Sequence, residues 1–241
     1  MVFLLLTVKE ITGRNIGRNM AVMQNHKTVI QNRKKREKNR RIQEILRAAK
    51  KTFFAKGYSK ATMDEIALEA EVSKPTIYQY FDTKDELFFS LLIPVIEDIG
   101  NQVNDINLRL EALEYESGAD VIRDIFKVYY NCFEQDTDTF MFFTIFQQIG
   151  MVYELNDTTR ESFIEKGKYC FNQGREIARR AKEQGFFKDI DEFYISDFVW
   201  GAFWGIVQLQ QMKPHNGDVN PHLKPTLELV ENSIIGSIVI K

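Results

Sequence analysis

Two helices of roughly two turns each are encoded between residues 62 and 81, and they constrain the fold more than any other feature of the chain. The first begins at Thr62-Met-Asp-Glu65, which is a capping box. In this motif the Thr62 hydroxyl accepts a hydrogen bond from the Glu65 amide, and the Glu65 carboxylate accepts one from the Thr62 amide. Ile66, Ala67 and Ala70 supply the apolar positions of a helix. A helix this short is stable only when it packs against another element.

The second short helix follows after a turn of about three residues. Ser73 is a favourable N-cap residue, and Pro75 falls in the first turn, where its missing N–H leaves no helical hydrogen bond unmade. The pattern predicts a helix over about residues 74–81. The small side chain of Ala67 lets this helix cross the first one closely. Two short helices joined by such a turn are the layout of a helix-turn-helix.

Longer helices flank this pair. Upstream, apolar residues recur at three- and four-residue steps from Ile42 to Phe54 and predict an amphipathic helix that ends at Gly57. Downstream, Thr83-Lys-Asp-Glu86 repeats the capping box and begins a helix that continues through Leu87. The two short helices are therefore expected to lie within a small helical domain.

The formal charge of the whole chain is only −2, but it is unevenly divided. Residues 1–81 hold 17 Lys and Arg against 7 Asp and Glu, a net charge of +10. Residues 82–241 hold 15 against 27, a net charge of −12. The run Arg33-Lys-Lys-Arg-Glu-Lys-Asn-Arg-Arg41 alone places seven basic residues in nine positions. This division indicates that the basic part faces a polyanion, through a salt-dependent attraction that suits tracking of a DNA minor groove.

Residues 40–92 resemble the DNA-binding domain of the tetracycline-repressor (TetR) family. The resemblance is carried by Thr62-Met-Asp-Glu-Ile-Ala, Ala70-Glu-Val-Ser73, Thr76-Ile-Tyr-Gln-Tyr-Phe81 and Lys84-Asp-Glu-Leu87. It implies a transcriptional regulator, most often a repressor, that binds a near-palindromic double-stranded DNA operator as a homodimer. One position departs from the family pattern. Glu71 stands where the family usually has a left-handed Gly, a difference that costs on the order of 1 kcal/mol.

The second short helix is expected to enter the major groove with its N-terminal residues near base edges. Gln79 is expected to read adenine through paired bonds to N6 and N7, and Thr76 to contact a thymine methyl group or a phosphate. Lys74 and Tyr80 are assigned to phosphate, as the resemblance also implies. Tyr80 has an alternative role in packing the domain core, which is the favoured role of Phe81.

Two further phosphate contacts are expected at helix N-termini, whose free amides and partial positive charge suit anionic oxygens. Thr62 and Lys84 lie at such termini on either side of the second short helix. The full set of expected DNA contacts is Thr62, Ser73, Lys74, Pro75, Thr76, Tyr78, Gln79, Tyr80 and Lys84.

Beyond Leu92 the pattern is helical throughout, so we expect an all-α fold with an N-terminal three-helix helix-turn-helix domain and a larger C-terminal helical domain for ligand binding and dimerisation. Pro94 is expected to kink or break the first long helix.

One hypothesis places the translation start at Met20 or Met23. The expected domains are a basic, loosely structured arm over residues 1–37, the DNA-binding domain over 38–92 and the helical domain over 93–241. The later helices are expected near 84–112, 119–135, 138–153, 157–184, 191–213 and 225–240.

Two C-terminal segments are apolar on nearly every side and must be buried accordingly. Residues 198–207 also carry Gly201 and Gly205 four positions apart, which permits close approach of another helix. We expect the last two helices to cover their own domain with one face and a second copy of the chain with the other, as in the TetR family. A monomer with two central helices is the alternative. The expected interface comprises Phe198, Gly201, Trp204, Gly205, Leu227, Val230, Ile234 and Ile238.

Aromatic residues gather in the C-terminal part, where twenty of the chain's thirty lie between residues 126 and 204. Each one suits a helical core, but together they exceed what packing needs and suggest an apolar pocket with a few polar contacts. We therefore expect an apolar small-molecule effector. The acidic surroundings favour a neutral or cationic effector, and a fatty or acyl ligand stays open. The candidate ligand contacts are Phe126, Tyr129, Tyr130, Phe133, Phe143, Phe146, Gln147, Tyr169, Trp204 and Gln208.

Other classes of protein find little support in the sequence. Cys132 and Cys170 are too few for a disulfide framework and indicate a reducing cytosol, and the three histidines have no metal-ligand spacing. The apolar first eight residues are too short for a membrane span. We expect no metal, cofactor or membrane partner, a cytoplasmic location and, without a phosphate loop or nucleophile motif, no enzymatic activity. The alternative functions are a DNA-bound dimer without an effector that recruits another protein and, as the least favoured reading, an all-α enzyme.

Overall fold

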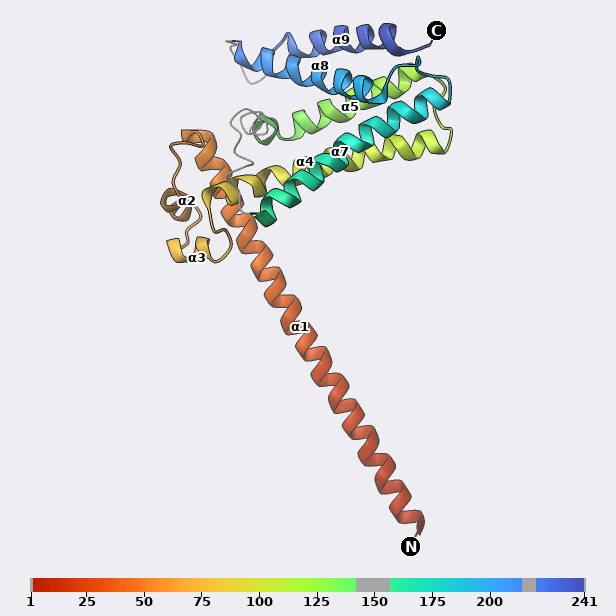
Figure 1. Ribbon diagram of the computed structural model, residues 1–241. Helices are drawn as coiled ribbons and strands as arrows, with labels where there is room; N and C mark the ends of the chain where they lie inside the picture. Colours follow the sequence, from red (N-terminus) through yellow and green to blue (C-terminus); the bar gives the residue numbers. More distant parts are fainter. Residues whose placement is uncertain (1, 142–156, 214–219, 241) are drawn as a thin grey trace. The chain divides into compact units, whose positions relative to one another are not determined.

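Helices are the only regular elements longer than a single bridge in this computed structural model, which describes residues 2–141, 157–213 and 220–240. The expectation of an all-α fold is confirmed (Figure 1). The chain divides into two compact units, an amino-terminal unit of residues 1–80 and a carboxy-terminal unit of residues 81–241. The helices are α1 (Val2–Lys56), α2 (Met63–Glu69), α3 (Lys74–Tyr78), α4 (Lys84–Glu111), α5 (Gly118–Gln135), α7 (Asp157–Glu183), α8 (Glu192–Met212) and α9 (Leu223–Ile238).

The amino-terminal unit is held by a small apolar core. Ile45, Ala49 and Phe53 recur at four-residue steps on one side of α1 and are fully buried, as are Ile66 of α2 and Ile77 of α3. Helix α1 packs against α2, and α2 packs against α3. Gly57 ends α1 with a φ of 76°, a left-handed conformation that glycine adopts without strain.

Helix α1 is longer than the sequence pattern predicted. Residues 1–37 were expected to be a loosely structured arm, but α1 runs without a break from Val2, and its first part extends away from α2 and α3 (Figure 1). This stretch contains no proline, and its glycines each cost a helix only about 1 kcal/mol, which lowers helical propensity without ending a helix. All residues from 28 to 40 are exposed.

The carboxy-terminal unit has a larger core that is rich in aromatic rings. Helix α4 packs against α7 and α5, and α8 packs against α7 and α9. The fully buried ring of Phe203 in α8 lies 5.8 Å from Phe126, 5.4 Å from Tyr129 and 6.4 Å from Phe140, measured between ring centroids. Edge-on and tilted ring pairs of this kind stabilise a core by more than the burial of their surface area alone.

The expected helix ends after Leu92 agree with the structure to within two residues for α4, α5, α7, α8 and α9. Helix α4 continues through Pro94 rather than breaking there, although a proline inside a helix removes one backbone hydrogen bond and its ring clashes with the carbonyl of the preceding turn. The helix expected over 138–153 lies mostly outside the described residues.

Candidate nucleic-acid interface and ligand cavity

Helix α3 turns one apolar side chain inward and its polar side chains outward. Ile77 is fully buried. Ser73 has the extended backbone of an N-cap residue, but its hydroxyl lies 2.8 Å from the Thr76 hydroxyl instead of capping a backbone amide. The side chains that α3 leaves exposed or half-buried are Lys74, Pro75, Thr76 and Tyr78. One buried anchor therefore leaves nearly the whole helix free to meet another molecule.

The second short helix is shorter than the predicted 74–81, because α3 ends at Tyr78. The amides of Gln79 and Tyr80 donate to carbonyls three residues back, at 3.3 and 2.9 Å, as in a tightened last turn. Gln79 is exposed and Tyr80 is half-buried. Phe81 is only 5% exposed, in keeping with a packing role. Gln79 therefore projects from the turn that follows α3.

Lys74, at the start of α3, forms an ion pair with Asp64 of α2. Its Nζ lies 2.8 Å from Asp64 Oδ1 and 3.0 Å from Oδ2, and both side chains are exposed. The hydrogen bond with Asp64 raises the pKa of Lys74, so this side chain stays protonated. The motif predicted a phosphate contact for Lys74 but did not reveal Asp64 as its partner. The only signal for this pair in the sequence is the spacing of ten residues across the turn.

The N-terminus of α2 forms the predicted capping box. The Thr62 hydroxyl accepts from the Glu65 amide at 3.3 Å, and Glu65 Oε2 accepts from the Thr62 amide at 3.1 Å. Lys56 Nζ donates to Glu65 at 2.7 Å, and this hydrogen bond is the main reason why the pKa of Glu65 is lowered. The exposed Thr62 hydroxyl thus already serves as the N-cap of α2.

The N-terminus of α4 forms only part of the second predicted box. Thr83 caps α4 by accepting from the Glu86 amide at 3.0 Å, but the Glu86 carboxylate accepts from the Asp82 amide at 2.8 Å. Lys84 is the half-buried first residue of α4 and belongs to the carboxy-terminal unit. Its role in phosphate binding stays a prediction.

The turn between α2 and α3 passes through Glu71 with a φ of 54°. The expectation of a left-handed residue here is confirmed, and a Glu in this conformation costs on the order of 1 kcal/mol relative to Gly. The turn still closes, because the Val72 amide donates to the Ala67 carbonyl at 2.9 Å. The departure from the family pattern therefore changes the energy of the turn and preserves its path.

Basic residues line one side of the later part of α1. Arg40, Arg41, Arg47 and Lys51 border a shallow groove against the end of α2. Acidic groups are interspersed, since Arg41 pairs with Glu44 at 2.9 Å and Lys51 pairs with Glu69 at 2.6 Å. The net positive field of this unit thus rests mainly on the exposed run from residue 33 to 41.

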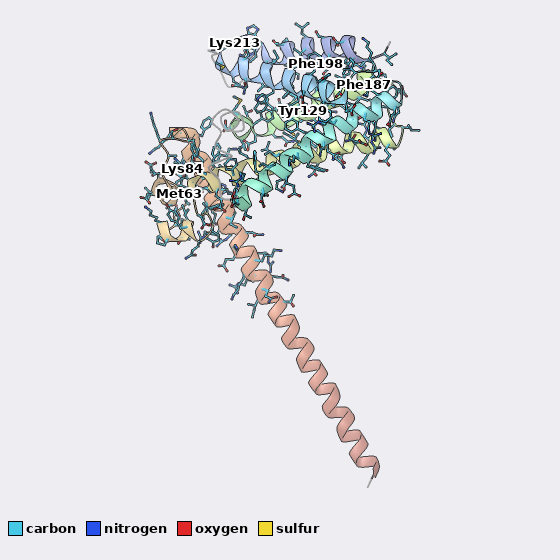
Figure 2. All side chains as sticks on the ribbon, viewed as in Figure 1. Met63, Lys84, Tyr129, Phe187, Phe198 and Lys213 are labelled. Atoms are coloured by element: carbon cyan, nitrogen blue, oxygen red, sulfur yellow. The ribbon has the colours of Figure 1, made fainter. Side chains whose placement is uncertain are left out.

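A cavity of about 50 Å³ lies inside the carboxy-terminal unit. Tyr129 of α5, labelled in Figure 2, borders it and makes ring contacts with Trp200 and Phe203 of α8. The lining comes from α4, α5, α7 and α8, with Phe140 from the segment after α5. Its described members are Val95, Ile96, Ile99, Tyr129, Phe140, Gly167, Cys170, Phe171, Gly174, Ser196 and Trp200.

Of the seven candidate ligand contacts within the described residues, only Tyr129 borders this cavity. Phe133 and Trp204 are buried in the surrounding core, and Phe126 and Tyr130 border a separate groove between α5 and α9. Tyr169 covers Gly100 instead, and Gln208 is half-buried away from the cavity. Phe143, Phe146 and Gln147 lie outside the described residues. The number of aromatic residues indicated that α5 and α8 line a pocket. It did not indicate that aliphatic residues of α4 line it as well.

The expected interface residues fall into two groups. Trp204, Leu227, Ile234 and Ile238 are buried within the protomer. Phe198, Gly201 and Gly205 are exposed, and Val230 is half-buried. The exposed group continues along one stripe of α8 at helical spacing, through Tyr194, Phe198, Gly201, Gly205, Leu209 and Met212. An apolar stripe of this length on a helix surface is typical of an interface.

None of the helices in residues 2–141, 157–213 and 220–240 is both long and apolar enough to span a bilayer. No group of three or more His, Cys, Asp or Glu side chains in that part of the chain is arranged to hold a metal ion.

Comparison with known proteins identifies the amino-terminal domain. Residues 45–91 match the family model described as bacterial regulatory proteins, tetR family. The HTH-type transcriptional activator FasR of Mycolicibacterium smegmatis is 49% identical over 49 residues, which cover 20% of this chain and 22% of FasR. The HTH-type transcriptional regulator Rv1556 of Mycobacterium tuberculosis, whose function is uncharacterized, is 25% identical over 183 residues, which cover 76% of this chain and 80% of that protein.

Solved structures extend the likeness of fold to both units. The TetR family transcriptional regulator PfmR from Thermus thermophilus superposes with a TM-score of 0.61 at 18% identity, covering 80% of this chain and 97% of PfmR. The match with FasR spans about a fifth of that relative's length, so it concerns the DNA-binding domain alone. The family and these relatives are transcriptional regulators rather than enzymes. At residues 45–91 the chain is similar to the DNA-binding domain of the tetR family of bacterial regulatory proteins.

Proposed function

We propose that the chain is a cytoplasmic transcriptional repressor that binds a palindromic operator as a homodimer and is released by an apolar small molecule. The observation that carries the DNA-binding part is the form of α3, whose single buried anchor, Ile77, leaves the polar side chains before and after it exposed. This is the form of a recognition helix that docks in the major groove.

The DNA contacts divide into base reading and phosphate binding. Gln79 is exposed just after α3 and has the amide needed for adenine N6 and N7. Lys74 exchanges its Asp64 partner for a phosphate when DNA binds, and Thr76 and Tyr78 border it on the same helix. The basic run from residue 33 to 41 adds attraction that is independent of sequence and falls with salt.

A helix of five residues reads too few bases for useful specificity, so two copies must bind one operator. The exposed stripe of α8 is the proposed contact between copies. Gly201 and Gly205 lie on it with no other atom within 4 Å of where a Cβ would stand, so these positions are open to a second helix. Packing Phe198 and Leu209, each about half exposed, would supply the apolar area.

The effector step rests on the cavity beside Tyr129. A ligand that binds one arrangement of the carboxy-terminal unit better than another shifts the population between DNA-binding and released dimers. Repression is the usual outcome in the family, whereas the relative FasR is named an activator. The sign of regulation then depends on where the operator lies relative to the promoter.

A second candidate is a DNA-bound dimer without an effector. The small volume of the cavity favours it, because a drug-sized ligand occupies several times more space. In that case the carboxy-terminal unit serves only to dimerise or to recruit another protein.

The experiment combines sedimentation and DNA binding. Sedimentation velocity of the full chain with a labelled operator duplex should show two chains per duplex, and addition of an effector should release the DNA without separating the two chains. One chain per duplex would contradict the dimer, and a library of apolar compounds that leaves the DNA affinity unchanged would favour the second candidate.

A further inference from the structure

The cavity in the carboxy-terminal unit has no Asp, Glu, His, Lys or Arg among its described lining residues. Its walls are aliphatic and aromatic, from Val95, Ile96 and Ile99 of α4 to Phe171 of α7 and Trp200 of α8. The Cys170 thiol borders it as a neutral group, because burial raises its pKa to about 11. A carboxylate or ammonium group placed among these residues would lose its water without gaining an ionic partner.

The two carboxylates that follow Ile96 in the sequence are engaged outside the lining. Glu97 pairs with Lys166 on the surface. Asp98 is exposed and accepts a hydrogen bond from Gln102 Nε2 at 2.8 Å, and the Cys132 thiol lies 3.6 Å from it. Neither carboxylate turns into the cavity as a partner for a buried cation.

Two hydroxyl groups border the cavity without a hydrogen-bond partner in the described part of the chain. Tyr129 makes ring contacts with Trp200 and Phe203, and burial raises the pKa of its phenol, so it is a neutral donor. Ser196 is also buried, and its Oγ would stand 2.8 Å from a Cβ added at Gly174. Each hydroxyl therefore has a donor that an oxygen of a ligand in the cavity would accept.

Tyr129, Gly174 and Ser196 also border a second, smaller cavity of about 10 Å³, whose other lining residues come mainly from α5, α7 and α8. The two hydroxyls therefore stand at the boundary of two adjacent apolar spaces. The other members of the second lining are aliphatic except for Phe187, and they include Ile122, Ile125, Ile177 and Val199. Tyr129 and Ser196 are thus the only hydroxyl-bearing residues among the described lining of the two cavities.

We propose that this cavity takes a neutral, largely apolar molecule with a single hydroxyl or carbonyl oxygen, which hydrogen-bonds with Tyr129 and Ser196 while its apolar body packs against α4 and Trp200. The inference rests on the proposed function only in using the same cavity, and it names the chemical class of the ligand. It excludes free fatty acids and amphipathic cations as ligands whose charged group enters the cavity.

The cavity must widen to hold such a molecule. Its 50 Å³ is room for only a few water molecules, whereas a six-membered carbon ring needs about 150 Å³. Ligand entry therefore moves α7 or α8 relative to α4, and this is the kind of two-state change that an effector must bias.

The test uses five probes that share one ring: cyclohexanol, cyclohexanone, methylcyclohexane, cyclohexanecarboxylate and cyclohexylammonium. Binding to the full chain is measured by calorimetry or ligand-observed NMR at neutral pH. Cyclohexanol or cyclohexanone should bind about tenfold or more tightly than either charged probe, and roughly three- to tenfold more tightly than methylcyclohexane. The double variant Tyr129→Phe, Ser196→Ala should reduce the oxygenated probes to the level of the hydrocarbon.

Ser233→Ala is a matched control, because it removes a hydroxyl from an exposed position outside the cavity and should change nothing. A charged probe that binds most tightly, an oxygen preference that survives the double variant, or no binding by any probe would overturn the inference. DNA affinity is measured separately. If an oxygenated probe binds without changing DNA affinity, the proposed ligand class is supported and the effector role is contradicted. If only a charged compound releases the DNA, the effector role is supported and the proposed ligand class is contradicted.

Discussion

The two units of the chain place their functional groups in opposite ways. In the amino-terminal unit the candidate contacts lie on the surface of α3, around one buried anchor, and work by charge and exposed hydrogen-bonding groups. In the carboxy-terminal unit the candidate contacts line an apolar cavity, and the polar groups are two neutral hydroxyls. Substitutions at functional positions should therefore change binding with little effect on stability in the first unit, and change both in the second.

Trp204→Arg should have the largest effect, because it tests the buried side of this comparison. The Trp204 ring is 8% exposed, stacks on Trp200 at 5.4 Å and lies 4.9 Å from Phe140. An unpaired charge and a lost ring at this point should lower the free energy of unfolding by about 3–5 kcal/mol or more. Chemical denaturation followed by circular dichroism measures it. Wild-type stability would show that Trp204 is not a core residue.

Gly205→Arg, one position along α8, should leave the protomer folded and act only on the dimer. Apart from the neighbouring backbone of α8 itself, no described atom lies within 4 Å of a Cβ at Gly205, and the position is exposed. A long charged side chain on the proposed interface should weaken dimerisation by about 100-fold or more, as a desolvated and unpaired charge does. Sedimentation equilibrium gives the dissociation constant. A dimer as tight as the wild type would move the interface away from this stripe of α8.

Lys74→Ala should weaken binding to every DNA sequence by about five- to tenfold and reduce the slope of log affinity against log salt by about one. The reason is the loss of one phosphate contact from an exposed side chain. Asp64→Asn is the matched opposite, because it frees Lys74 from its ion pair and should tighten binding. Fluorescence anisotropy over a salt series measures both variants. If Lys74→Ala keeps the wild-type salt slope, Lys74 is not a phosphate contact.

Glu71→Gly should have the smallest effect and should appear as stability alone. Glu71 and Leu113 are non-glycine residues with φ values of 54° and 57°, one in each unit. Glycine relieves the strain but adds freedom to the unfolded chain, so each substitution should raise the free energy of unfolding by about 0.5–1 kcal/mol. Thermal unfolding of Glu71→Gly and Leu113→Gly measures it. Glu71→Ala keeps the left-handed strain and should give no such gain.

The amino-terminal unit was predictable from sequence because its signals are local. The capping box at Thr62, the N-cap position of Ser73 and the left-handed residue at 71 each depend on neighbours within a few positions, and all three appear in the structure. The length of α3 was less predictable, because the hydrogen bonds of Gln79 and Tyr80 decide it and composition does not.

The cavity was not predictable in the same way, because its lining joins residues from four helices far apart in the sequence. Val95, Ile96 and Ile99 have the ordinary apolar spacing of any buried helix. Gly174 and Ser196 carry no motif, and they become informative only when α7 and α8 bring them together. Contacts between residues far apart in the sequence cannot be predicted from the local periodicity of apolar residues.

Selection of bound sites from random DNA by the full chain tests the central claim, that two copies of α3 with Gln79 read an operator, most directly. The expected result is an inverted repeat whose half-sites lie about one helical turn apart, and Gln79→Ala should relax the preference at one position in each half-site. Enrichment of no motif, of a single half-site, or of a motif that Gln79→Ala leaves unaltered would contradict the account.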